Sequence, residues 1–172
     1  MEDRPKIKLQ LGVTEIILES LGWLAILAIW GLVIVNYSTL PNSIPTHFNA
    51  AGVPDTYGSK PELFVLPIIA TLTFLLVTFL NKFPEIFNYP TDITTSNASA
   101  QYLNSTGMMR YLKMILVVIF GTIVYNKIQL AQGISEGLGV WFLPINLGLL
   151  FIPLIYFISN SFRLSKKFQV NE

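Results

Sequence analysis

Residues 20–37 have the sequence SLGWLAILAIWGLVIVNY, an uncharged apolar run that decides the fold class. Its 18 residues form a helix of roughly 27 Å, close to the thickness of the hydrocarbon core of a bilayer. Of the 172 residues in the chain, 52% are hydrophobic and only 12% are charged, whereas a soluble domain carries about 25% charged residues. The composition therefore predicts an all-α integral membrane protein.

Three further apolar stretches follow the first one. We expect a single membrane domain with an uncharged core of only 13 residues, Met114–Asn126, in its third span. Lys113 and Lys127 flank that core, so we expect their ammonium groups to snorkel toward opposite interfaces. The predicted segments are four transmembrane helices at about 16–37, 62–81, 111–130 and 140–162, an extracytoplasmic loop at 38–61 and a cytoplasmic segment at 82–110.

The distribution of basic residues predicts the orientation. An even number of spans places both termini on one side of the membrane, and the positive-inside rule assigns the more basic side to the cytoplasm. Nine of the 11 Lys and Arg residues fall on the side of the termini: Arg4, Lys6, Lys8, Lys82, Arg110, Lys113, Arg163, Lys166 and Lys167. The net charge of +1 gives no reason to expect a nucleic-acid partner, and the chain has no cysteine for disulfides or thiolate catalysis.

Acidic residues near the first span allow two interpretations. Glu15 and Glu19 lie one turn apart on one helical face, and the simpler expectation is that both are solvated at the cytoplasmic interface. The alternative is a buried pair with Arg110 or Lys113. Ionisable groups within spans usually mark ion or proton pathways, and their scarcity here weakens the hypotheses of a transporter and of an intramembrane hydrolase.

The polar segment between the first two spans is the candidate functional region. Residues 41–60, PNSIPTHFNAAGVPDTYGSK, hold the only histidine of the chain, His47, with three prolines and two glycines. Alternation around residues 44–49 is typical of extended chain, and we expect turns at 49–52 and 54–58. With so many prolines, this loop is expected to form an ordered cap over the outer ends of the helices.

These residues also carry a resemblance to a known family. The ordered set Pro45-Thr46-His47-Phe48-Asn49, Gly52, Asp55 and Gly58-Ser59-Lys60, followed by a span with an early proline, resembles the domain that forms the N-terminal part of SdpI-type immunity proteins. The resemblance covers roughly residues 20–80. It implies a helical protein of the bacterial inner membrane with a role in immunity against a secreted peptide, or in signalling.

The leading hypothesis is a non-enzymatic module whose loop binds a peptide, a lipid-linked ligand or another membrane protein. His47 would be its hydrogen-bonding centre and Asp55 the carboxylate partner, while Lys60 would face an anion. The complete set of candidate ligand-binding residues is His47, Phe48, Asn49, Asp55, Tyr57 and Lys60.

Two alternatives remain open at this stage. A metal-dependent membrane enzyme could use His47, Asp55 and Glu62, since one imidazole and two carboxylates form a plausible ligand set for a divalent metal. The loop could also be purely structural and lock the hairpin of the first two spans. In that case His47→Ala and Asp55→Ala would lower thermal stability and leave any binding unchanged.

Overall fold

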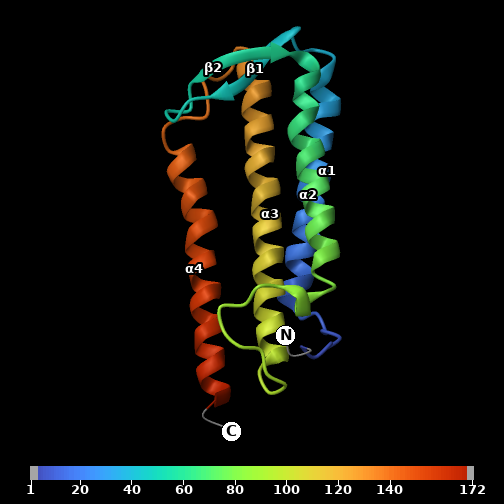
Figure 1. Cartoon of the computed structure of the whole chain (residues 1–172). Coiled ribbons are helices and arrows are strands. Elements are labelled where there is room, and N and C mark those ends of the chain that lie inside the picture. Colours follow the sequence, from blue (N-terminus) through green and yellow to red (C-terminus); the bar gives the residue numbers. More distant parts are fainter. Residues whose placement is uncertain (1–3, 170–172) are drawn as a thin grey trace.

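The helices of this protein run side by side along one axis, and a short β-hairpin covers one end of them (Figure 1). The computed structural model describes residues 4–169. The two ends of the described chain lie at the end of the bundle opposite the hairpin. In chain order the elements are α1 (Val13–Tyr37), β1 (Ser43–Phe48), β2 (Pro54–Ser59), η1 (Lys60–Phe64), α2 (Val65–Leu80), η2 (Pro84–Ile86), α3 (Ala98–Ala131) and α4 (Phe142–Gln169).

Within residues 4–169, four helices are long and apolar enough to cross a membrane. This supports the predicted multi-pass membrane protein of mostly helical structure, and the loop between the first two spans contains two paired strands. The third helix differs most from its expected bounds. It begins at Ala98 rather than near 111, because the polar residues before Arg110 continue the helix and pack against α4.

Helices α1, α2 and α3 share the apolar core. Gly22 on α1 lets α1 and α2 approach closely, because a Cβ at this position would lie 2.3 Å from the ring of Phe74 on α2. The indole N–H of Trp30 donates a hydrogen bond of 3.0 Å to the Thr71 hydroxyl, which links the same two helices. Apolar packing with a few side-chain hydrogen bonds is how helices associate in lipid, where burial of apolar surface contributes little.

Helix α4 is attached through α3 and exposes much of its surface. At the end of the bundle away from the hairpin, the Gln101 amide donates to the Ser161 carbonyl at 2.9 Å and accepts from the Ser161 hydroxyl at 2.6 Å. Asn104 donates to the Phe157 carbonyl at 2.9 Å. No residue in the most apolar window of α4 is buried within the described chain. One face of α4 therefore follows α3, and the other faces are available to lipid.

The hairpin is antiparallel and irregular. Ser43 pairs with Ser59 and His47 with Thr56, and the register shifts on either side of His47. The expected turn at 49–52 is present: the Asn49 side-chain oxygen accepts hydrogen bonds from the backbone N–H groups of Ala51 and Val53. The second expected turn, at 54–58, is wrong, because these residues form strand β2 and pair with β1.

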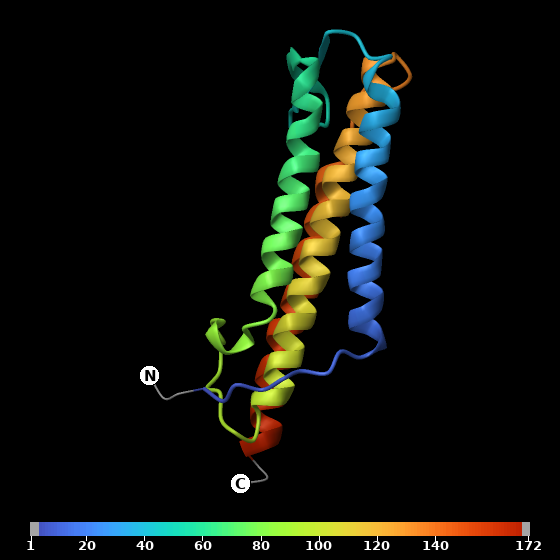
Figure 2. The same ribbon diagram turned by 90° about the vertical axis from the view of Figure 1, so that its right-hand side faces the viewer.

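The segment before α1 crosses the opposite end of the bundle (Figure 2). Arg4 donates to the backbone carbonyls of Glu85 and Phe87 at 3.1 and 2.6 Å. Its guanidinium also lies 5.3 Å from the ring centroid of Tyr89. The N-terminal segment is thereby joined to the connection between α2 and α3.

Candidate functional site

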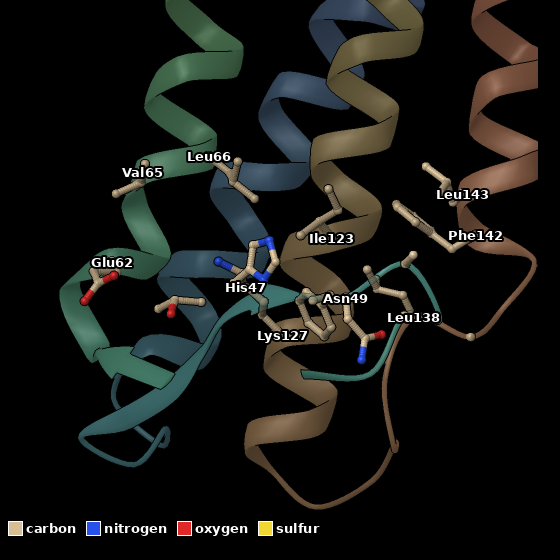
Figure 3. Close-up of a pocket in the computed structure, with 15 residues that line it drawn as sticks. His47, Asn49, Glu62, Val65, Leu66, Ile123, Lys127, Leu138, Phe142 and Leu143 are labelled. Atoms are coloured by element: carbon tan, nitrogen blue, oxygen red, sulfur yellow. The ribbon is translucent and has the colours of Figure 1, made fainter. Parts of the chain in front are cut away.

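A cavity of about 470 Å³ lies directly beneath the hairpin. Figure 3 shows its labelled lining residues converging from β1, the start of α2, α3 and the loop that leads into α4. This volume is within the range of about 300–1,000 Å³ that small-molecule sites occupy. Most of the walls are apolar. The lining residues are Thr46, His47, Phe48, Asn49, Ala50, Gly52, Glu62, Val65, Leu66, Ile123, Lys127, Leu138, Gly139, Phe142 and Leu143.

Lys127 is the buried cation of this cavity. The expectation that it snorkels into water is wrong, because only 6% of the residue is exposed. The same correction applies to Lys113, which is 1% exposed. Within residues 4–169 the Lys127 ammonium has no hydrogen bond and no ion pair. Glu62 is the other charged residue of the wall.

His47 lies on the cavity wall and is oriented by Asp55. Its Nδ1 is 2.6 Å from Asp55 Oδ1. A carboxylate on Nδ1 fixes the tautomer that carries a proton there, so Nε2 is the ring nitrogen left for another partner. The side chains are 67% and 41% exposed, so water competes strongly with this pair. Asp55 is not part of the cavity wall.

The remaining predicted residues have local structural contacts. The Lys60 ammonium donates to the carbonyls of Ser38 and Leu40 at 3.3 and 2.9 Å, which holds the hairpin to the end of α1. Asn49 lines the cavity, and its side-chain oxygen also holds the hairpin turn. Tyr57 is 56% exposed and lies outside the cavity. Of the six predicted residues, three line the cavity: His47, Phe48 and Asn49. The other three, Asp55, Tyr57 and Lys60, lie outside its lining.

Of the three predicted metal ligands, His47 and Asp55 contact each other, whereas Glu62 has other partners. Glu62 Oε1 accepts from the Ser59 backbone N–H at 2.8 Å and lies 3.2 Å from its hydroxyl. This capping box starts the helical turn that leads into α2. In the described part of the chain, no three His, Asp or Glu side chains form a group suited to a metal ion.

Sequence reasoning missed the contact that closes the cavity on the α4 side. The Leu138 N–H donates to the Gly52 carbonyl at 2.8 Å. Gly52 has φ +77, and a Cβ on it would lie 2.7 Å from backbone atoms of Gly139. The signal is the sequence Gly137-Leu138-Gly139, since paired glycines allow two backbones to approach closely.

A second polar cluster lies inside the bundle, away from the hairpin. The Lys113 ammonium donates to both carboxylate oxygens of Glu19, at 2.8 and 2.7 Å, and also contacts the Thr78 hydroxyl. Arg110 Nε lies 3.2 Å from the same carboxylate. The interfacial interpretation is therefore wrong for Glu19, and the buried-pair alternative is the one observed.

Comparison with known proteins finds similarity to one family model in the region that contains the hairpin. Residues 24–71 match a family described as "Domain of unknown function (DUF1648)". An "Uncharacterized protein" of the archaeon Archaeoglobus fulgidus is 33% identical over 106 residues, which cover 57% of this chain and 58% of the relative. The chain thus spans less than two thirds of this relative. No solved structure matches.

Proposed function

We propose that this chain is an SdpI-like, non-enzymatic immunity or signalling protein of the bacterial inner membrane, which holds a ligand in the cavity beneath its hairpin. The observation that carries the proposal is the cavity itself, walled by His47 and Phe48 of the hairpin on one side and by Lys127 of α3 on another. The family match at residues 24–71 includes both strands of the hairpin. The proposed ligand is a peptide, a lipid-linked molecule or a segment of a membrane partner.

The proposal also places the hairpin outside the cytoplasm. Arg4 contacts the connection after α2, Lys82 follows the end of α2, and Lys166 lies in the last turn of α4. These ends of the helices lie away from the hairpin (Figure 1), and a cytoplasmic location for them satisfies the positive-inside rule. Because the chain has no cysteine, single cysteines can be introduced at Tyr57 and at Lys166. A membrane-impermeant maleimide should label position 57 in intact cells and leave position 166 unlabelled. The reverse pattern would overturn the proposed orientation.

Photo-crosslinking from the cavity walls tests the binding function. A photoreactive phenylalanine placed at Phe48 and, separately, at Phe142 samples two different walls, while the same group at Tyr57 samples the hairpin outside the cavity. After irradiation in cells, intact-protein mass spectrometry should show one added mass that is common to positions 48 and 142 and absent at position 57. Such a shared mass identifies a single ligand in contact with both walls.

Two results would contradict this proposal. Equal adducts at all three positions would indicate nonspecific contact with lipid, and no adduct at either wall would indicate an unoccupied cavity.

Metal analysis of the purified protein tests the alternative hypothesis of a metal-dependent enzyme. Stoichiometric metal that disappears in the His47→Ala variant would favour a metal-dependent enzyme that uses His47, Asp55 and Glu62.

A further inference from the structure

Lys127 is the lysine of a mostly apolar pocket, and it interacts electrostatically with Glu62, the acidic residue of the same lining. A buried ammonium normally has an ion pair or several hydrogen bonds, because the loss of its hydration is costly. Lys127 is 94% buried by its 6% exposure, yet within residues 4–169 it has neither kind of contact. Lys60, at the same end of the bundle, has two carbonyl acceptors. This difference leaves the Lys127 ammonium available to an anionic group in the cavity.

The position of Lys127 fits the depth of a lipid head group. It lies about one turn before α3 ends at Ala131, which places its ammonium near the membrane interface. Trp141, 71% exposed, lies just before α4, and tryptophan is enriched at that same depth. A phosphate in the head-group layer could therefore reach Lys127 without entering the hydrocarbon core.

The cavity also provides apolar walls for acyl chains. Val65 and Leu66 begin α2, whereas Phe142 and Leu143 begin α4, and all four line the cavity. Val65 and Leu143 remain exposed, so the mouth of the cavity has apolar side chains at its edges. Because α4 packs mainly on α3 and is otherwise uncovered, acyl chains could continue from the mouth along the bundle into the bilayer.

From these observations we infer that the cavity takes a lipid of the surrounding bilayer through its phosphate group, with Lys127 as the ion partner and the acyl chains between the starts of α2 and α4. This inference rests on the proposed binding function and names its ligand class. The Glu62 carboxylate of the same lining already accepts a hydrogen bond from the Ser59 backbone N–H, so Lys127 is the residue assigned to the phosphate.

Matched probes test this inference on the full chain in neutral maltoside micelles. Dioctanoyl phosphatidic acid and dioctanoylglycerol differ only in the phosphate, and glycerol 3-phosphate supplies the phosphate without acyl chains. Phosphatidic acid should raise the unfolding temperature of the protein saturably, and the other two should not. Lys127→Gln should weaken phosphatidic acid binding by about tenfold or more, because hydrogen bonds to charged groups contribute about 1.5–3 kcal/mol. Lys127→Arg should retain binding, and Lys82→Gln, at an exposed lysine after α2, is the control for a lost positive charge.

Each contrary result separates this inference from the proposed function. Equal stabilisation by dioctanoylglycerol would contradict recognition of the phosphate group. Equal stabilisation by glycerol 3-phosphate would contradict a bilayer lipid as the source of that phosphate. Both results are still compatible with a cavity that binds a ligand. No response to phosphatidic acid together with a shared photo-adduct at positions 48 and 142 would mean that the cavity binds another class of ligand. If Lys127→Gln does not fold, the comparison of the three probes on the unaltered chain still decides the question.

Discussion

Removing the carboxylate of Glu19 should strongly destabilise the protein. The Lys113 side chain is 0% exposed and that of Glu19 is 20% exposed, and two short hydrogen bonds join them. Glu19→Gln leaves Lys113 and Arg110 as two buried cations without a counter-charge. Breaking such a buried pair costs about 3–5 kcal/mol. For a chain of this size each kcal/mol lowers the unfolding temperature by about 2–4 °C, so the loss should be roughly 6–20 °C.

Thermal unfolding of the purified protein in detergent measures this effect. The matched control is Glu15→Gln, one turn earlier on α1, where the carboxylate has no ion pair within the described residues. The double variant Glu19→Gln with Lys113→Met should lose less stability than the sum of the two single variants, because one unpaired cation has been removed with its partner. Equal, small shifts for Glu19→Gln and Glu15→Gln would refute the buried cluster.

Three other predictions concern the hairpin and the opposite end of the bundle. His47→Ala should lower the free energy of unfolding by only about 0.2–1 kcal/mol, because its contact with Asp55 is exposed to water. A larger loss in a denaturant titration would favour a purely structural loop. Gly52→Ala should cost at least about 1 kcal/mol, since φ is +77 and the new Cβ meets the Gly139 backbone. Gly31→Ala should not destabilise the protein in this way, because a Cβ at that position has nothing within 4 Å. Equal unfolding temperatures for the Gly52→Ala and Gly31→Ala variants would contradict the close contact between Gly52 and Gly139. Burial raises the pKa of Tyr89 from 10.0 to about 12, so the folded state keeps a proton that the unfolded chain releases. Stability should therefore fall as pH rises between those values, and unfolding temperatures of Tyr89→Phe should show a shallower fall; identical profiles would refute it.

Much of the architecture could be predicted from the sequence because membrane spans are encoded locally. The run at 20–37 has the length and polarity of a helix in lipid without reference to any other part of the chain. The same applies to the ordered loop, since Asn49 and Gly52 have the chemistry of a turn. The sequence also placed His47 and Asp55 in the same small region, eight residues apart, where a hydrogen bond forms.

What the sequence could not provide are contacts between distant positions. Glu19 and Lys113 are 94 residues apart, so their pairing depends on the rotation of α1 and α3 about their own axes. The burial of Lys127 has the same origin. A lysine near a helix end is ordinarily expected to reach water, and only the hairpin and the start of α4 close that route. Lys60 was assigned to a ligand because its acceptors, carbonyls such as that of Leu40, belong to backbone that sequence alone does not position.

A structure of the protein in a lipid bilayer tests the central claim most directly. The cavity between His47 and Lys127 should contain density that is not part of the chain, with its head within hydrogen-bonding distance of the Lys127 ammonium and an extended tail between the starts of α2 and α4. A collapsed cavity, with α4 packed against α2 and Lys127 turned into water, would contradict the account.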